Sequence, residues 1–412
     1  MKKNQDSLDT EKDVKDIKNE VTDKSDEISN NIENNDKSPK AKNKKSEKDK
    51  KTKQKKKLKL HEKIVIVLAI LFVIGCSTVV FLLYGPWSGF RDWLITTAMR
   101  SMNHQYLATW FYSDKTIQEC LDKNRVVEVS GHTDENAIEI VNYEEEEEIT
   151  YANEYERQIL EKSKKNNDYK IIKIDGGRKF TGYMAVIYDP SRVEVATSAY
   201  IGSSGQYLTE ISKKNNALVA INAGGFRDEN YQGTGSTPLG ITINKNKTIA
   251  NATYGNIIGF NNEHKLILGK YSSSQAKSKG IRDCVSFEPY LIMNGEKSQI
   301  YGNGGWGTAP RTAIGQRADG IVLFLVLDGN RTLGQGATIK DLLDIFDRYG
   351  AINASNLDGG TSTSMTVKSK TINDPTNLSG AHSTRPIPSA FILRADDSDD
   401  GDYSVVKNRV DK

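Results

Sequence analysis

Cysteine is scarce in this chain of 412 residues, which contains three. Cys76 lies inside an apolar run, so Cys120 and Cys284 are the two that remain for the rest of the chain. Two cysteines exclude a disulfide-stabilised scaffold and a cysteine metal cluster. They would form one disulfide only if the segment that carries Cys120 folds back onto the domain that carries Cys284, and this question stays open.

Metal-binding patterns are also missing. His132, His264 and His382 are scattered without the spacing of a zinc site, and the chain has no Asp-x-Asp-x-Asp-Gly calcium loop. Aspartate, asparagine and hydroxyl oxygens would still suit calcium or magnesium. We therefore expect no required cofactor. A structural divalent cation remains open.

The charge pattern argues against nucleic acid as a partner. A net charge of +3 averages an acidic arm, a lysine-rich tract at 40–59 and a nearly balanced remainder. No arginine or aromatic residue interleaves with the lysines as a base reader would. Because the tract lies directly before an apolar run, its expected partner is the anionic inner leaflet of a membrane.

The apolar run covers residues 64–84 and carries no charged residue. It is long enough to cross a bilayer, so we expect one transmembrane helix within 61–85 after a disordered arm at 1–60. A cleaved signal peptide is the rival interpretation, but the arm is long and no Ala-x-Ala site follows. The lysines before the run place the N-terminus in the cytoplasm and the rest outside the cell.

Residues 86–168 form an expected juxtamembrane region. Its apolar and aromatic residues recur at roughly helical spacing, so a helix could pack on the following domain, on its own copy in a dimer, or at the membrane interface. The oligomeric state stays open. The residues concerned are Trp93, Leu94, Ala98, Met99, Met102, Tyr106, Leu107, Trp110 and Phe111.

Two aspartates mark the expected catalytic domain at 169–396. The apolar run 321–327 ends at Asp328, a helix capped by Thr338 follows, and a second short strand ends at Asp358. This order is a strand, crossover helix and parallel strand, which brings both acids to one edge of a sheet. Ligands bind at that edge in open α/β sheets. An isolated Asp-Gly pair would be a simple turn, but two pairs in one unit indicate a site.

The segments around these strand ends are rich in glycine and hydroxyl groups. A third strand, 217–221, ends at Asn222, whose amide could bind a sugar substituent or close an Asx-turn on its own backbone. Glycines let a ligand approach the backbone, and hydroxyls donate to an anion or a sugar. The candidate substrate-binding residues of this kind are Asn222, Gly224, Gly225, Gly359, Gly360, Thr361 and Ser362.

Two arginines complete the candidate site. Arg311, followed by Thr312, precedes the first aspartate strand, and Arg385 precedes the last apolar run at 390–393. A guanidinium matches the oxygens of a phosphate or carboxylate. His382, in the loop before Arg385, is a second-tier candidate. The constellation predicts an anionic, oxygen-rich substrate.

Five segments in order resemble the phosphodiester glycosidase family: 221–226, 238–240, 310–315, 356–360 and 385–386. That family includes the enzyme that removes N-acetylglucosamine from a phosphodiester to uncover mannose 6-phosphate, and bacterial members described as exopolysaccharide-related. The likeness covers about 171–394. It implies hydrolysis of a sugar-1-phosphodiester at the anomeric carbon–oxygen bond, with Asn222, Arg311, Asp328, Asp358 and Arg385 in the site.

One departure concerns the turn after the first aspartate strand. The family commonly has Asp-Gly-Arg, whereas this chain has Asp328-Gly329-Asn330-Arg331, which makes Arg331 doubtful as a site residue. Asp358 is expected to be the principal catalytic acid or base, and Asp328 is expected to assist or orient it. Retention or inversion at the sugar stays open.

Taken together, the sequence predicts a mixed α+β fold with a twisted mixed sheet and packed helices in one extracytoplasmic domain, followed by an acidic tail at 397–412. The expected function is hydrolysis of a phosphate-linked cell-surface glycan or wall polymer. Two alternatives stay open: a non-catalytic carbohydrate-binding or polymer-assembly factor, and a hydrolase of the phosphoester bond itself. The sugar and its partner are not determined.

Overall fold

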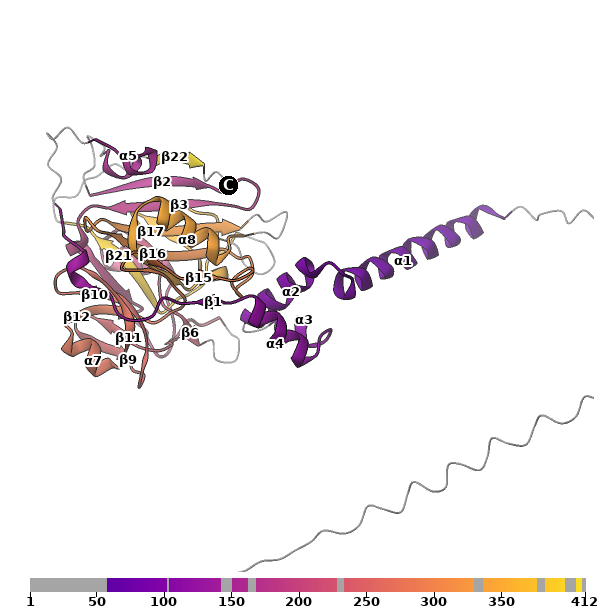
Figure 1. The fold of residues 1–412 in the computed structure, drawn as a ribbon, viewed down its shortest axis with the longest axis horizontal. Helices are drawn as coiled ribbons and strands as arrows, with labels where there is room; N and C mark the ends of the chain where they lie inside the picture. Colours follow the sequence, from indigo (N-terminus) through magenta and orange to yellow (C-terminus); the bar gives the residue numbers. More distant parts are fainter. Residues whose placement is uncertain are drawn as a thin grey trace, which may run out of the picture. The chain divides into compact units, whose positions relative to one another are not determined.

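The computed structural model describes residues 58–101, 104–141, 150–161, 168–227, 233–329, 336–375 and 382–396, and the backbone of 405–409. Most of the predicted N-terminal arm and the doubtful Arg331 lie outside these residues. The chain forms two units, residues 1–67 and 68–412. Figure 1 shows the second unit as a block of packed sheets with helices on its surfaces.

Helix α1 (Leu60–Tyr84) contains the predicted apolar run. Its side chains are almost all exposed, and Leu83 near its end is the buried exception. In the part of the chain that the structure describes, α1 is the one helix that is long and apolar enough to cross a membrane. Length and composition fit a membrane anchor and also a signal sequence.

Three helices follow α1: α2 (Ser88–Arg100), α3 (Tyr106–Thr109) and α4 (Asp114–Lys123). They share a small apolar core that includes Ile95 and Ile117. They also dock on the sheets, because Trp93 Nε1 donates to Thr308 Oγ1 at 3.0 Å and Asn303 Nδ2 donates to Thr96 Oγ1 at 2.8 Å. Packing on the following domain, one of the three interpretations of this region, is therefore present in the structure.

Elements after Lys123 pair with and pack on the sheets, ahead of the predicted domain boundary at 168. Strand β1 (Val126–Val127) pairs with β15 (Gln299–Ile300), and the short helix η1 (Glu135–Ala137) follows. Helix α5 (Glu154–Leu160) buries its last two residues in the core beside the sheet. These segments precede the predicted start of the domain, yet their backbone and side chains are built into it.

In the described residues, the domain contains three larger sheets and two two-stranded sheets, β1-β15 and β6-β7. The largest has the order β14-β13-β18-β16-β17-β3-β2-β22, and two five-stranded sheets have the orders β20-β19-β5-β21-β4 and β11-β10-β12-β8-β9. The strands of the largest sheet are β2 (Tyr169–Asp175), β3 (Phe180–Ile187), β13 (Tyr290–Met293), β14 (Glu296–Lys297), β16 (Arg311–Arg317), β17 (Val322–Gly329), β18 (Ala351–Leu357) and β22 (Val405–Arg409).

The first five-stranded sheet contains β4 (Val193–Thr197), β5 (Ala217–Asn222), β19 (Met365–Val367), β20 (Lys370–Thr371) and β21 (Ser389–Arg394). The second contains β8 (Thr242–Asn244), β9 (Lys247–Ala250), β10 (Gly255–Asn261), β11 (Leu266–Tyr271) and β12 (Ile281–Val285). The remaining elements are β6 (Phe226–Arg227), β7 (Thr237–Pro238), α6 (Leu208–Lys214), α7 (Ser273–Ser278), α8 (Ile339–Arg348), η2 (Pro190–Arg192) and η4 (Gly360–Ser362).

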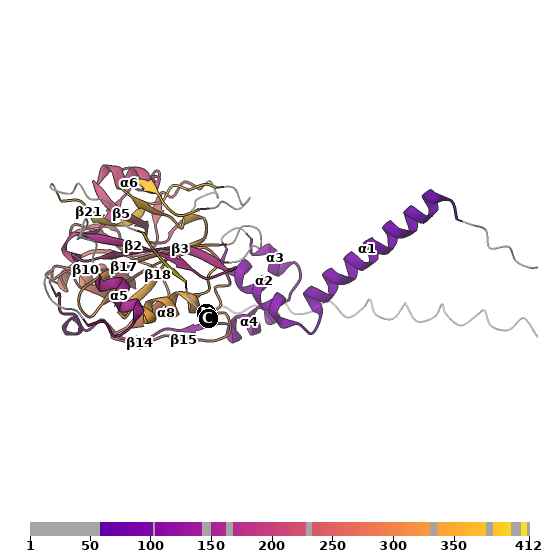
Figure 2. The same ribbon diagram turned by 90° about the horizontal axis from the view of Figure 1, so that it is seen from above.

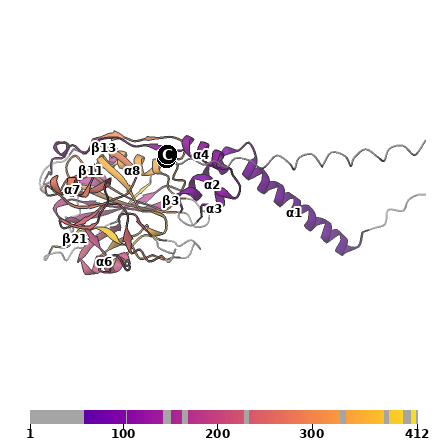
Figure 3. The ribbon, with the colours of Figure 1, turned by 90° about the horizontal axis from the view of Figure 1, so that it is seen from below.

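The fold class is mixed α+β, as predicted, and its layers follow from the side-chain alternation of β17. Val322, Phe324 and Val326 point into a core shared with the first five-stranded sheet. Leu323, Leu325 and Leu327 point to the other face, where α5 and α8 cover the large sheet. Helix α6 covers the outer face of the five-stranded sheet, and Figures 2 and 3 show α6 and α8 on opposite sides.

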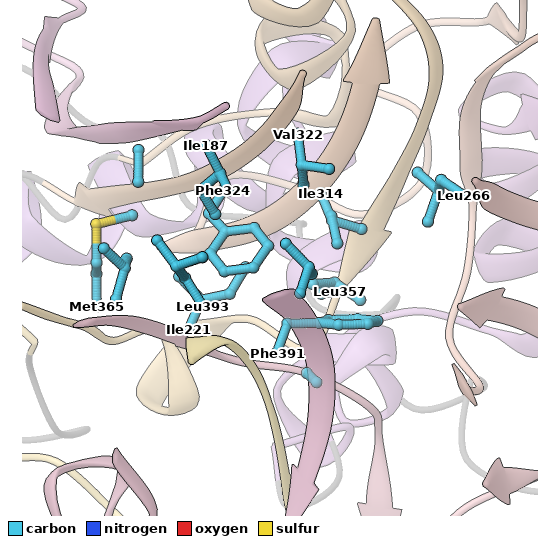
Figure 4. Packing of buried hydrophobic residues seen from close by; sticks show 14 of the residues in the cluster. Ile187, Ile221, Leu266, Ile314, Val322, Phe324, Leu357, Met365, Phe391 and Leu393 are labelled. Carbon is cyan, nitrogen blue, oxygen red and sulfur yellow. The ribbon is translucent and has the colours of Figure 1, made fainter. Parts of the chain in front are cut away.

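The core between the two sheets holds the strands that carry the candidate site. Ile221 of β5, Leu357 of β18 and Phe391 of β21 meet Phe324 and Ile314 of the large sheet (Figure 4). Burying side chains of this size stabilises the fold by roughly 1.5–3 kcal/mol each. The strand ends after Ile221 and Leu357 are therefore fixed by close packing immediately beneath them.

The predicted crossover unit is confirmed. Strands β17 and β18 both pair antiparallel with β16, which lies between them, so β17 and β18 run parallel and end at the same edge. Helix α8 connects them, with Thr338 and Asp341 in a capping box. Gly350, at a φ of +74°, ends the helix as predicted.

The C-terminal tail was predicted as a separate acidic segment. Within it, the backbone of β22 pairs parallel with β2 and extends the large sheet by one strand. At least this part of the tail is therefore an edge strand.

Candidate active site

Asp358 follows β18 and its side chain is partly exposed at the edge of the sheet. Both of its backbone groups are held by the neighbouring strand end: its N–H donates to Ala223 O at 3.0 Å, and its carbonyl accepts from Asn222 Nδ2 at 2.5 Å. A carboxylate that is accessible on a main chain fixed from both sides can act on a substrate in a defined position.

The two positions after Asp358 favour glycine for different physical reasons. A Cβ at Gly359 would lie 2.9 Å from Pro310 O, so only glycine allows the turn to pass this close to the start of β16. Gly360 has a φ of +60°, donates to Pro310 O at 2.8 Å and has nothing within 4 Å of its Cβ position. Gly360 is therefore the one of the pair that leaves open space beside the backbone.

Asn222 was predicted to bind substrate, and the structure places it beneath the Asp358 turn. Its side chain is fully buried. Nδ2 donates to Asp358 O, while Oδ1 accepts from Thr312 Oγ1 at 2.7 Å and from Ser364 N at 3.1 Å. Asn222 and Thr312 therefore position the Asp358 turn from below and do not face a substrate.

Arg311 is likewise a framework residue. Its guanidinium is buried and donates to three backbone carbonyls, those of Ala337 at 3.2 Å, Trp306 at 2.7 Å and Gly307 at 3.0 Å. Burial lowers the pKa of Arg311 to about 10, and the positive charge of Arg100 adds to this effect. Arg311, predicted to contact substrate, thus connects the 306–307 segment with Ala337 in this structure.

Asp328, at the equivalent end of β17, is 6% exposed. One carboxylate oxygen accepts from Asn373 Nδ2 at 2.7 Å and the other accepts from Asp374 N at 2.8 Å. Of the two predicted roles for Asp328, assisting or orienting, this geometry supports orienting, because both oxygens hold the loop at 373–374.

That loop leads to the accessible side of the site. The Asp374 and His382 side chains are both exposed, and Asp374 Oδ1 lies 2.6 Å from His382 Nδ1. Arg385 follows three residues later, stacked over the Phe226 ring at 4.6 Å, with its Nη1 3.5 Å from Thr361 Oγ1. Arg385 and Thr361 are both partly exposed, so a guanidinium and a hydroxyl lie together three residues after Asp358.

Three further candidates face inward. A Cβ at Gly224 would lie 2.9 Å from Val285 Cβ, and one at Gly225 would lie 3.0 Å from the Phe287 ring. Their N–H groups already donate, to Ser389 Oγ and Ser286 O respectively. Ser362 is buried within η4. In this structure the two glycines permit close packing under the site, and Ser362 lies in its buried part.

Unused hydrogen-bonding capacity remains beneath η4. Within the described ranges, Thr363 Oγ1, Ser364 Oγ and Asn356 Oδ1 are buried and have no hydrogen-bond partner. Native structures contain few such atoms, and they gather where function requires them. Their position next to the Asp358 turn adds to the case for a site at this edge.

Sequence reasoning missed Asn373, Asp374 and Ser389. Asn373-Asp374-Pro375 is a turn signature, so these residues suggested a loop and no role. Their role depends on Asp328, which is 45 residues away in the chain from Asn373. Ser389 supplies Oγ to Gly224 N at 3.2 Å from the first residue of β21.

No metal centre is evident among the described residues, where no group of three or more His, Cys, Asp or Glu side chains is gathered. Cys120 and Cys284 are both buried and free, one in α4 and the other in β12. Burial raises the pKa of each thiol to about 12. Both are inert thiols and neither contributes to the site.

The model of the phosphodiester glycosidase family matches residues 215–394, which contain β5, β16, β18, η4 and β21. The match to this family covers less than half of the chain. Asn222, Asp328, Asp358 and Arg385 all lie within this phosphodiester glycosidase segment. The segments 169–197, 124–141 and 150–160 are packed against it but precede the match.

A curated relative is the SPbeta prophage-derived uncharacterized protein YomE of Bacillus subtilis, 28% identical over 228 residues. The match covers 53% of this chain and 35% of YomE, so the chain spans about a third of that relative.

Among solved structures, the zebrafish N-acetylglucosamine-1-phosphodiester alpha-N-acetylglucosaminidase catalytic domain, auto-inhibited by its pro-peptide, is similar at 20% identity and a TM-score of 0.48. The similarity covers 56% of this chain and 83% of that domain. A hypothetical protein from Synechocystis matches at 17% identity and a TM-score of 0.40, over 54% of this chain and 61% of its own.

Proposed function

We propose that the protein is a membrane-anchored glycosidase that hydrolyses a sugar-1-phosphodiester, with an N-acetylglucosamine-like sugar, to free sugar and a phosphomonoester. The observation that carries this proposal is the Asp358 turn, an accessible carboxylate on a main chain that Ala223 and Asn222 hold from below. The match of residues 215–394 to the family model supports the reaction class.

Asp358 is proposed to act at the anomeric carbon. A glycosyl phosphodiester has a good leaving group, so the departing phosphate needs less proton donation than an alkoxide does. One ionised carboxylate can then stabilise the positive charge that develops on the sugar, or activate the attacking water. A neutral amide at the same position could do neither.

Arg385 and Thr361 are proposed to hold the phosphate. A guanidinium and a hydroxyl whose Nη1 and Oγ1 lie 3.5 Å apart can donate to two oxygens of one phosphate. The Phe226 ring under Arg385 keeps the guanidinium plane in place. Charge that builds on the leaving phosphate would be stabilised at this point, while Asp358 acts on the sugar side.

The location of the reaction follows from α1. We propose that α1 is an anchor, that the N-terminus is cytoplasmic and that the domain faces outside, toward cell-wall or exopolysaccharide polymers. The 25-residue apolar helix with exposed side chains supports an anchor. Phosphate-linked glycans of the cell surface would then be the natural substrates.

The test is incubation of the full-length protein in detergent with an N-acetylglucosamine-1-phosphodiester and identification of the products by mass. Free N-acetylglucosamine from the parent, and none from a folded Asp358→Asn variant, is the expected result. Sugar phosphate would mean that a phosphoester bond is cut. Glycan binding by both proteins without any product would favour the carbohydrate-binding or assembly role.

The same assay tests the metal question. We expect the rate to be unchanged after exhaustive chelation, because the proposed groups are a carboxylate, a guanidinium and a hydroxyl. A rate that falls on chelation and returns with calcium or magnesium would contradict this and show that a divalent cation takes part.

A further inference from the structure

A cavity lies where the helices after α1 meet the sheet domain. Its volume is about 610 Å³, and its walls come from α2, α4 and the segment 124–128 on one side, and from β11 and the segments 288–289 and 305–306 on the other. Seven of its twelve lining residues precede residue 215, where the family match begins. The cavity is therefore largely made by parts of this chain outside the family segment.

The lining of this cavity contains more basic than acidic side chains. Arg100, Arg125 and Lys270 line it together with Glu128 and Glu288. Glu288 Oε1 lies 3.4 Å from Arg100 Nη1 and offsets part of that charge. Burial raises the pKa of Glu128, which moves this acid toward its neutral form. Lys270 acts on Glu128 with its positive charge, so the three basic and two acidic side chains leave a small excess of positive charge in the lining.

The two arginines are held in place, as a preformed anion site requires. Arg100 lies over the Trp306 ring at 4.3 Å and its Nε donates to Gly305 O at 3.2 Å. Arg125 lies over the Tyr301 ring at 5.1 Å and donates to Asp122 O. Fixed guanidinium groups lose little freedom when an anion binds.

The size and the apolar part of the lining indicate what the anion is attached to. A single phosphate would fill a small fraction of 610 Å³. Met99, Leu121, Val126 and Pro289 provide carbon surface between the charges, which suits the carbon skeleton of a sugar or polyol. The cavity thus fits several linked units that carry phosphate.

The cavity also shares its wall with the candidate active site. Glu288 O accepts from Asn356 Nδ2 at 2.8 Å, and Asn356 precedes Asp358 by two residues on β18. Trp306 O accepts from Arg311 Nη2. A ligand in the cavity would therefore lie one layer of residues from the strand ends that carry the site.

We propose that this cavity binds a phosphate-bearing segment of a glycan or polyol polymer. The site is separate from Asp358 and goes beyond the proposed hydrolysis, because binding in the cavity requires no cleavage. A polymer held here would be retained by the protein whichever of its bonds is cut elsewhere.

The test is calorimetric titration of the full-length protein, in nanodiscs of phosphatidylcholine, with a synthetic glycerol phosphate oligomer at fixed ionic strength. The Lys270→Gln and Arg125→Gln variants should each bind about tenfold more weakly, since each loses one charged contact. Lys247→Gln is the matched control, because Lys247 is an exposed lysine on β9, the opposite edge strand of the same sheet. It should bind like the parent.

Three results would overturn the proposal: equal affinity of the parent and both cavity variants, parent binding no tighter than that of inorganic phosphate, or displacement of the oligomer by soluble short-chain phosphatidylglycerol at lower concentration. The last would assign the cavity to a lipid headgroup. Lys270 is exposed, so its variant keeps the test valid if Arg125→Gln fails to fold. Asp358→Asn should still bind the oligomer, which separates this proposal from the failure of the proposed hydrolysis.

Discussion

Two strand ends of the same sheet carry the same Asp-Gly pair and differ in what surrounds them. At the end of β17, Asp328 is buried and both carboxylate oxygens accept hydrogen bonds from the loop at 373–374. At the end of β18, the Asp358 backbone is held by Ala223 and Asn222 while its side chain is partly exposed. One aspartate thus supports the frame, and the other is presented to solvent.

The difference teaches that position at a sheet edge does not decide the role of an acid. What decides it is which part of the residue the neighbouring segments use. The neighbouring loop binds the buried carboxylate of Asp328, whereas Ala223 and Asn222 bind the main chain of Asp358. Asp358 is also partly exposed, so a substrate can reach it.

The largest expected effect is that of Asp358→Asn. We predict a fall in the hydrolysis rate of about a thousandfold, the scale of removing a general acid or base, because an amide cannot take up a proton or balance positive charge. The thermal unfolding midpoint should stay near that of the parent, since the two backbone bonds of Asp358 are unaffected. An active, folded variant would contradict the catalytic role that distinguishes Asp358 from Asp328.

The opposite pattern is expected for Asp328→Ala. The substitution removes the two carboxylate oxygens that accept hydrogen bonds from Asn373 Nδ2 and Asp374 N. Loss of these two bonds should lower the free energy of unfolding by about 2 kcal/mol. The catalytic rate should fall much less than in Asp358→Asn. Urea denaturation and steady-state kinetics on the same preparation measure both quantities, and a large rate loss with unchanged stability would reverse the roles of the two aspartates.

Asn222 connects the two regions and should give an intermediate result. Asn222→Ala removes three hydrogen bonds, so we expect a stability loss of about 2 kcal/mol and a rate roughly tenfold lower, as the Asp358 turn loosens. Thr312→Val is the matched control, since it removes one of the three. If the two substitutions have equal effects, the hydrogen bond from Asn222 to Asp358 O is not the one that fixes the Asp358 turn.

The smallest expected effect is a change in the pH dependence of stability that arises from His264. Burial and the nearby Arg282 lower the pKa of His264 below its ordinary value of 6.5. The unfolded chain therefore binds a proton more readily, and stability falls as the pH drops through about 6.5. His264→Asn, which tolerates the local φ of +63°, should flatten this dependence in thermal unfolding. An unchanged slope would assign the acid sensitivity elsewhere.

Much of the fold could be predicted from the sequence because its signals are local. The apolar run of β17, the capping residue Thr338 and Gly350 together specified the crossover unit, and the parallel ends of β17 and β18 followed. The separation into three sheets could not be predicted, because strands such as β5 and β21 pair across more than 160 residues of chain. Periodicity within a strand does not identify such partners.

The candidate site was predictable as a set of residues but not in its roles. The side chains of Asn222, Arg311 and Thr312 are types that often bind ligands. In the folded chain they are buried and form hydrogen bonds within the protein. Gly224 and Gly225 indicated close approach correctly, but what approaches them is the chain at Val285 and Phe287. Near the accessible side, Asp374 contacts His382 and Thr361 contacts Arg385. These contacts form only when the chain folds, so the sequence did not indicate them.

The most direct test of the account is hydrolysis of an N-acetylglucosamine-1-phosphodiester by the full-length protein in ¹⁸O-labelled water, followed by mass measurement of the phosphate-containing product. If Asp358 serves attack at the anomeric carbon, the bridging oxygen leaves with the phosphate and the phosphomonoester carries no label. A phosphate product that contains ¹⁸O would show attack at phosphorus and would contradict the proposed glycosidase reaction.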